Sequence, residues 1–330
     1  MINKIIKSTV ALSLVATVAF GADGARFNVI NGDVSEKYAH LIDSIEDSIG
    51  FSVSKNENIN DAYAKKYGDK AGPNYDKDWT ITLDSLGFYS MSNDAKLNSI
   101  LKTNPEVAGF APFNLLSYKK VNEDRTFIGH LSPETMLNIV GTKDEAVRKD
   151  FIAMFNPLDK WVQDNLGGKV EVGTFDVLPA KPMMNFEIPF DRPEELEEFV
   201  EEFQENFEGA FEDKKYIIAG YKDFKEAYAD LEMPFEEYDA FFVYSLCHFT
   251  FSYNVFNKGR PDNGVFAPCS MYMYIKKDSN TIVVGMPTLA NWVSVMNITN
   301  PAKVEWTKKI DAEIISIMKE IGAKEIWEKY

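Results

Sequence analysis

Cys247 and Cys269 are the only cysteines of the chain, and their thiols are its clearest candidates for chemistry. In an exported protein, such a pair favours a disulfide. A bridge would close a loop of about 23 residues and stabilise the fold by roughly 3 kcal/mol. The motifs CxxC and CxxCH do not occur, so the sequence lacks a thioredoxin-type redox motif and a site for covalent haem attachment.

A soft-metal site is a second hypothesis for these thiols. Cys269, Met271 and Met273 alternate along one predicted strand, so their side chains should share a face. Thiolate and thioether groups select Cu(I), and copper is therefore the metal that this pattern favours. The candidate ligands are Cys247, Cys269, Met271, Met273 and Met286. Methionine is also an ordinary filler of apolar cores, so a packed core is the alternative.

Aromatic residues offer a third kind of site. Tyr272, Tyr274 and Trp292 could line a pocket between a sheet and a helix that binds a small apolar or planar ligand. The alternative is again a packed core.

The three histidines give little support for catalysis. His248 follows Cys247 directly, and neighbouring strand residues point to opposite faces, so the two should not share a pocket. His130 aligns with Met286 of the second half, and His40 lies off the apolar face of its helix. The motifs GxSxG, HExxH and GxxxxGK[ST] are absent. The sequence therefore identifies no catalytic residue, and a non-enzymatic role is favoured.

The second half of the chain repeats the first. Phe110-Ala111-Pro112 recurs as Phe266-Ala267-Pro268, an offset of 156 (266 − 110), and Tyr118 and Lys120 meet Tyr274 and Lys276 at the same offset. A fixed offset indicates a structural unit present twice. At this offset the counterparts of Cys247 and Cys269 are Met91 and Phe113, both apolar. The joint replacement predicts that the two cysteine positions touch, one on each of two neighbouring strands.

The hydrophobic pattern predicts the same elements in both halves. Apolar residues spaced by three and four mark helices near residues 38–49 and 196–207, and closing helices near 145–165 and 302–321. Three strands joined by short turns precede each closing helix. The prediction is an α+β fold of two tandem two-layer sandwiches, each with a mainly antiparallel sheet, helices on one face and β-α-β-α-β-β-β-α order. The expected units are 22–167 and 185–330, with a linker at 168–184.

The N-terminus and the charge bear on location and partners. Lys4 and Lys7 precede an uncharged apolar run, Ser8 to Phe20, and Ala19-Phe20-Gly21 provides small residues, so residues 1–21 are expected to be a cleaved signal peptide. The expected location is the periplasm or the exterior, with no membrane segment after cleavage. A net charge of −16 disfavours nucleic-acid partners.

The second half resembles the domain-of-unknown-function 302 family. The resemblance lies in the end of the strand at Cys247, the Phe266-Ala267-Pro268-Cys269 turn, the Tyr274–Val284 hairpin and Met296-Asn297. It covers about 185–323, and the first half resembles the family more weakly. The resemblance implies a compact α+β fold and no established reaction.

Together these features favour an exported, soluble tandem-domain protein that binds or senses a small ligand or a soft metal. A thiol–disulfide redox protein and a structural or interaction protein with an inert disulfide are the alternatives. The sequence does not choose a ligand or a partner protein.

Overall fold

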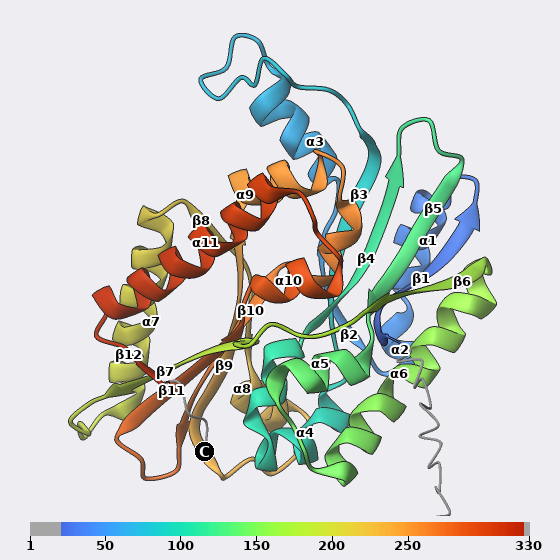
Figure 1. Cartoon of the computed structure of the whole chain (residues 1–330). Helices are drawn as coiled ribbons and strands as arrows, with labels where there is room; N and C mark the ends of the chain where they lie inside the picture. The colour runs from blue at the N-terminus through green and yellow to red at the C-terminus, as the bar shows by residue number, and fades with distance from the viewer. Residues whose placement is uncertain (1–20, 327–330) are drawn as a thin grey trace, which may run out of the picture.

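The computed structural model describes residues 21–326 and contains two six-stranded antiparallel sheets with helices packed on them (Figure 1). The predicted α+β class, with two similar units in tandem, is confirmed. Residues 1–20, which hold nearly all of the expected signal peptide, lie outside the described residues.

The first half forms a sheet in the order β2-β3-β4-β5-β1-β6. Its elements are β1 (Ala22–Asn31), α1 (Ser35–Ile42), α2 (Ile45–Ile49), β2 (Ser52–Asn56), α3 (Ile59–Tyr63), the π-helix η1 (Ala64–Gly68), β3 (Leu83–Ser92), α4 (Asp94–Thr103), the 3₁₀ helix η2 (Pro105–Phe110), β4 (Phe113–Lys120), β5 (Arg125–Leu131), α5 (Pro133–Val140), α6 (Glu145–Leu166) and β6 (Lys169–Phe175).

The second half repeats this order, and its sheet reads β8-β9-β10-β11-β7-β12. Its elements are β7 (Met183–Pro189), α7 (Leu196–Asp213), β8 (Tyr216–Asp223), α8 (Phe224–Asp230), β9 (Tyr238–His248), α9 (Phe249–Phe256), the 3₁₀ helix η3 (Pro261–Phe266), β10 (Cys269–Lys276), β11 (Thr281–Pro287), α10 (Ala290–Val295), α11 (Pro301–Glu320) and β12 (Lys324–Ile326). Each strand of one sheet therefore has a counterpart at the same place in the other.

Side-chain caps fix where the key helices begin. Asn93 accepts a hydrogen bond from the Lys96 amide at the start of α4, and His248 accepts one from the Phe251 amide at the start of α9. Asp144 and Asn300 cap the closing helices α6 and α11 in the same way. Asn93 and His248 thus hold equivalent positions, and the role of His248 is that of a helix cap.

The two halves pack through the inner faces of their sheets. Helices α7 and α11 cover the outer face of the second sheet, while α1 and α6 lie on the outer side of the first (Figure 1). On the inner side, η3 packs on β4 and η2 packs on β10. Each half therefore covers the inner face of the other, which explains why β4 and β10 are buried along most of their length.

Two details differ from the sequence prediction. β3 and β4, and likewise β9 and β10, are joined by an α-helix and a 3₁₀ helix rather than by a short turn. The expected linker at 168–184 includes β6, which pairs with β1 as an edge strand of the first sheet. The connecting helices and β6 are short or polar, so their hydrophobic periodicity is too weak to identify them from the sequence.

An arm formed by residues 59–82 leaves the first half and lies against α9 of the second (Figure 1). The Tyr67 and Tyr253 rings stack at 4.0 Å, and Trp79 lies 5.8 Å from Tyr253. Asp76 accepts hydrogen bonds from the Tyr253 hydroxyl at 2.9 Å and from Lys258 Nζ at 2.7 Å. These contacts fix the arm to the other half.

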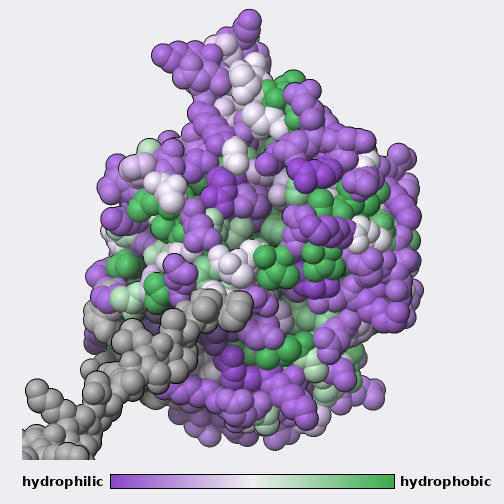
Figure 2. Space-filling model, turned by 45° about the vertical axis from the view of Figure 1, so that its right-hand side comes forward, coloured by the Kyte–Doolittle hydropathy of each residue, from purple (hydrophilic) through white to green (hydrophobic). Residues whose placement is uncertain are grey.

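The surface is mainly hydrophilic on the face seen in Figure 2, where hydrophobic residues form several separate patches. Among residues 21–326, no helix is long and apolar enough to span a membrane.

Candidate functional site

Two cavities lie where the edge strands β2 and β8 of the two sheets meet. The strands are joined by a 3.3 Å hydrogen bond from Asn56 Nδ2 to the Ala219 carbonyl. We call the cavity that contains Cys247 the thiol pocket, and the cavity that contains Ser90 and Ser245 the serine pocket. Both halves contribute residues to each of them.

The thiol pocket has a volume of about 180 Å³ and an apolar lining. Ile217, 47% exposed, stands at its rim, whereas Phe88 and Phe256 are buried in its wall. The full lining consists of Asn56, Ile59, Tyr63, Phe88, Ile217, Ile218, Ala219, Cys247, Phe249, Ser252, Phe256, Ala267 and Pro268.

The hydroxyl groups at the base of the thiol pocket are already paired with protein. The Tyr63 hydroxyl donates to Ser252 Oγ at 2.9 Å, and Ser252 Oγ donates to the Phe249 carbonyl at 2.9 Å. The Cys247 thiol lies 3.9 Å from Ser252 Oγ and donates to it. A ligand here meets apolar side chains and a sulfur atom.

Burial keeps these groups uncharged. It raises the pKa of Cys247 to about 11, although the Ser252 hydrogen bond opposes the shift, and it raises the pKa of Tyr63 well above its ordinary value. Cys247 is therefore a protonated thiol near neutral pH and a poor nucleophile.

The serine pocket has a volume of about 170 Å³, and five of its eleven lining residues are serines. Lys222 Nζ forms an ion pair with Asp94 at 2.6 Å, and its Nζ lies 3.5 Å from Ser52 Oγ. Ser92 donates a short hydrogen bond to Asp94. The full lining consists of Ser52, Val53, Ser54, Ser90, Ser92, Pro112, Gly220, Tyr221, Lys222, Val243 and Ser245.

The two pockets are copies of one another, related by the internal repeat. Phe113 pairs with Met91 in the first sheet, and its counterpart Cys269 pairs with Leu246 in the second. The next residue along each strand is Ser92 in β3 and Cys247 in β9, so these two are structural equivalents. Four further residues of the thiol pocket have an equivalent in the serine pocket. With the thiol-pocket residue given first, the pairs are Phe88 and Val243, Ile217 and Ser52, Asn56 and Lys222, and Pro268 and Pro112.

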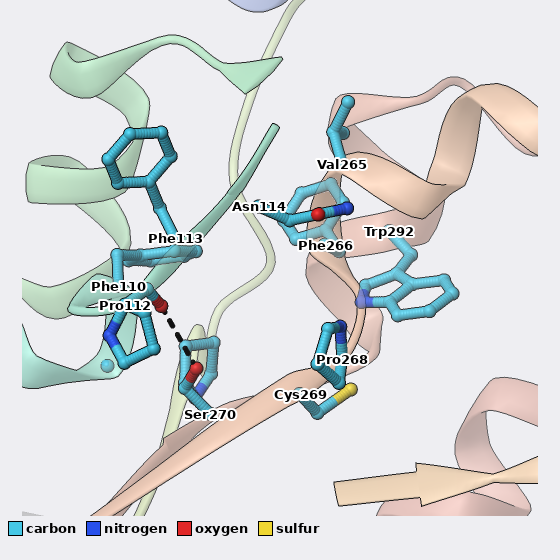
Figure 3. A pocket seen from close by; sticks show the side chains of 12 residues that line it. Phe110, Pro112, Phe113, Asn114, Val265, Phe266, Pro268, Cys269, Ser270 and Trp292 are labelled. Atoms are coloured by element: carbon cyan, nitrogen blue, oxygen red, sulfur yellow. Dashed lines mark hydrogen bonds between the residues drawn. The ribbon is translucent and has the colours of Figure 1, made fainter. Parts of the chain in front are cut away.

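A third, much smaller cavity of about 20 Å³ lies at the centre of the interface (Figure 3). Equivalent residues of both halves line it, among them Phe110 with Phe266 and Pro112 with Pro268. Ser270 Oγ donates to the Pro112 carbonyl at 3.2 Å across it. The cavity is about the size of a single water probe, so it holds no organic ligand.

The aromatic residues singled out from the sequence do not meet around a ligand pocket. Tyr272 and Tyr274 stack at 6.2 Å on the inner face of the second sheet, on the strand that η2 covers, and Gly285 leaves room for the Tyr272 ring. Trp292 lines the central cavity and packs on Phe256 and Phe266. The aromatic residues of the thiol pocket come from other segments.

Both cysteines are free, and the strand register gives the physical reason. Cys269 pairs with Leu246, so its side chain shares a face with Leu246 and not with the next residue, Cys247. The prediction that the two sulfurs lie side by side rests on an alignment of Cys247 with Met91 and is wrong. The structural counterpart of Cys247 is Ser92 (247 − 92 = 155), and this one-residue difference turns the side chain to the opposite face of the sheet.

The candidate copper ligands are divided in the same way. Met271, Met273 and Met286 are fully buried on the outer face of the second sheet together with Cys269, as their alternation predicts. Cys247 lies on the inner face. Among the described residues, no group of three or more His, Cys, Asp or Glu side chains is arranged to hold a metal ion.

His130 and Met286 do occupy equivalent positions, since His130 pairs with Arg26 and Met286 pairs with Met184. His130 Nε2 lies 3.1 Å from Asp159 Oδ1, which also accepts a 2.8 Å hydrogen bond from Arg26. The first half thus has a polar cluster on its outer face where the second half has methionines.

One residue of the thiol pocket, Cys247, is identifiable as a candidate from the sequence alone. Its neighbours Ile59, Tyr63 and Phe88 come from the other half, and no periodicity connects residues so distant in the chain. The serine pocket carried no signal at all, because isolated serines on strands are common.

No family model matches this chain, and no curated protein matches it. Among solved structures, the chain is similar to the crystal structure of an uncharacterized conserved protein DUF302 from Bacillus stearothermophilus, with 18% identity and a TM-score of 0.36. The alignment covers 43% of this chain and 99% of that chain. The neighbour therefore carries the name of the family that the sequence resembles.

Proposed function

We propose that the protein binds a small apolar ligand in the thiol pocket, as a non-enzymatic binding or sensing module. The observation that carries the proposal is an apolar cavity between the two halves in which the Tyr63, Ser252 and Cys247 polar groups are already satisfied. Ligand sites are typically concave and mostly apolar. Together with the expected signal peptide, this makes an exported carrier or sensor the preferred function.

The volume of the pocket limits the ligand. An apolar cavity of roughly 150 Å³ accepts benzene, and the thiol pocket has about 180 Å³. Ligands of one aromatic ring or a short branched alkane therefore fit. The exposed side chain of Ile217 at the rim gives such a molecule an apolar surface to cross.

The arrangement supports the redox alternative less well. A thiol–disulfide cycle requires two sulfurs within bonding reach and a thiolate to attack. Here the side chains leave opposite faces of the sheet, and burial raises the pKa of both thiols. The copper alternative has the same difficulty, because Cys247 is separated from the methionines.

Toluene binding tests the proposal. The full mature chain is titrated with toluene, and amide shifts of β8, β9 and α9 are followed by NMR. Saturable shifts confined to these segments are expected. Ile217→Asp places a charge at the rim and should weaken binding at least tenfold without unfolding the protein, since Ile217 is 47% exposed.

Leu231→Asp is the matched control, because Leu231 is also 47% exposed and lies outside the pocket lining. It should bind toluene like the unchanged protein. Shifts that fail to saturate, or equal weakening by both substitutions, would reject the thiol pocket as the site.

A further inference from the structure

We propose that the serine pocket is a second binding site, specific for a small neutral ligand that carries several hydroxyl groups. The proposal does not depend on the apolar ligand of the thiol pocket. It rests on the hydrogen-bonding state and the charge of the residues that line the serine pocket.

Three hydroxyls of this pocket have no protein partner. Within residues 21–326, the side chains of Ser54, Ser90 and Ser245 form no hydrogen bond, although Ser90 and Ser245 are 9% and 3% exposed. They belong to β2, β3 and β9, so they approach the cavity from three strands. None of the three hydroxyl oxygens is among the fully buried unpaired atoms of the described residues, so each is accessible from the cavity and free to pair with water or a ligand.

The charge of the pocket selects a neutral ligand over an anion. Lys222 would attract an anion, but Asp94 lies 2.6 Å from its ammonium group and both side chains are largely buried, at 19% and 14% exposure. Asp94 also occupies the first turn of α4, where a bound anion would otherwise profit from the helix dipole. The positive charge is therefore already neutralised by protein.

A polyol matches the remaining groups. Each serine hydroxyl can donate one hydrogen bond and accept up to two, as can each hydroxyl of the ligand. The cavity of about 170 Å³ has room for more than one water molecule, and the exposed Ser54 places it in contact with solvent. Val53 and Val243 supply apolar surface for the carbon chain.

The test uses the full mature chain and the polyols glycerol and xylitol as probes, with NMR shifts of β2, β3 and β8 as the readout. Saturable shifts in these strands are expected. The double variant Ser90→Ala/Ser245→Ala removes two of the unpaired hydroxyls and should weaken binding at least tenfold. Ser316→Ala, on the exposed side of α11, is the control and should bind normally.

Ser54→Ala is a second variant. It should not disturb folding, because Ser54 is exposed, and it should weaken polyol binding several-fold. Inorganic phosphate tests the charge argument: it should not bind the unchanged protein, but it should bind Asp94→Asn, in which Lys222 loses its counter-ion. Absence of saturable polyol shifts, unchanged affinity in the double variant, or phosphate binding to the unchanged protein would overturn the proposal.

Discussion

The thiol pocket and the serine pocket share a backbone plan but differ in the side chains that line them. Cys247 stands where the other pocket has Ser92, and Ile217 stands where it has Ser52. In the thiol pocket the Tyr63, Ser252 and Cys247 groups are paired with one another, whereas in the serine pocket three hydroxyls have no protein partner. A few side chains therefore decide whether the same cavity favours an apolar or a polar ligand.

The outer faces of the two sheets differ in a similar way. The paired positions are Arg26 and His130 in the first sheet, and Met184 and Met286 in the second. Asp159 on α6 completes the polar cluster in the first half. Duplication thus preserved the strand register and left the side chains free to diverge, which allows one chain to hold two unlike sites.

The largest expected effect comes from Phe256, which forms a wall of the thiol pocket. Its ring is 1% exposed and lies 5.4 Å from Phe88. Phe256→Ala should lower the free energy of unfolding by about 3–5 kcal/mol and enlarge the thiol pocket. Urea unfolding measures the loss, and toluene and naphthalene titrations measure the change in ligand size.

Leu101→Ala is the matched variant in the first half, where Leu101 occupies the corresponding helix and is fully buried outside the serine pocket. It should destabilise by about 2–5 kcal/mol and leave polyol binding unchanged. A loss below 1 kcal/mol for Phe256→Ala would show that the interface is less tightly packed than the structure indicates.

The second prediction concerns thiol reactivity. Because burial raises the pKa of Cys247 to about 11, the native thiols should react with a disulfide reagent at pH 8 roughly a hundredfold more slowly than the thiols of the unfolded chain. Two thiols per chain should titrate in denaturant without reductant, since both cysteines are free. If the denatured protein instead reacts only at the background level until reductant is added, the two cysteines form a disulfide.

The third prediction exchanges the distinguishing residues. Cys247→Ser puts a hydroxyl into an apolar cavity, where the shorter C–O bond keeps it beyond hydrogen-bond reach of Ser252. We expect a loss of about 1–3 kcal/mol in unfolding free energy and several-fold weaker toluene binding. Ser92→Cys, the reverse exchange, removes only the hydrogen bond to Asp94 and should cost about 1 kcal/mol. Equal costs would mean that the two environments are more alike than their linings suggest.

Much of the fold could be predicted from the sequence, but little of either pocket. The repeated Phe-Ala-Pro segment and the helical periods identified both halves and most of their strands. The offset of 156 is correct at Pro112 and Pro268 but is one residue too large at Cys247, because 21 residues lie between Cys247 and Cys269, whereas 20 lie between their structural counterparts Ser92 and Phe113. A local pattern does not reveal such a slip.

The pockets depend on the association of the two halves, which the sequence pattern does not encode locally. Ile59 and Tyr63 reach Cys247 only because the arm of the first half lies on α9. Ser54 and Ser245 share a cavity only because β2 and β8 meet. Predicting either site would have required the interface itself.

The smallest expected effect concerns the arm, which contributes Ile59 and Tyr63 to the lining of the thiol pocket and no residue to the lining of the serine pocket. Hydrogen bonding from Lys258, followed by that from the Asp78 amide, lowers the pKa of Asp76 to about 2. A carboxyl with a depressed pKa stabilises the fold above its unfolded pKa of about 3.9, and this contribution is lost as the pH falls toward 2. Asp76→Asn should therefore lower the urea midpoint slightly at pH 6 and match the unchanged protein near pH 2. Asp69→Asn, in the exposed part of the same arm, serves as control.

The same variant tests whether the arm acts on one pocket alone. If toluene exchange is faster in Asp76→Asn while polyol exchange is unchanged, the arm acts on the thiol pocket alone. Equal changes in the exchange of both ligands would contradict a role specific to the thiol pocket.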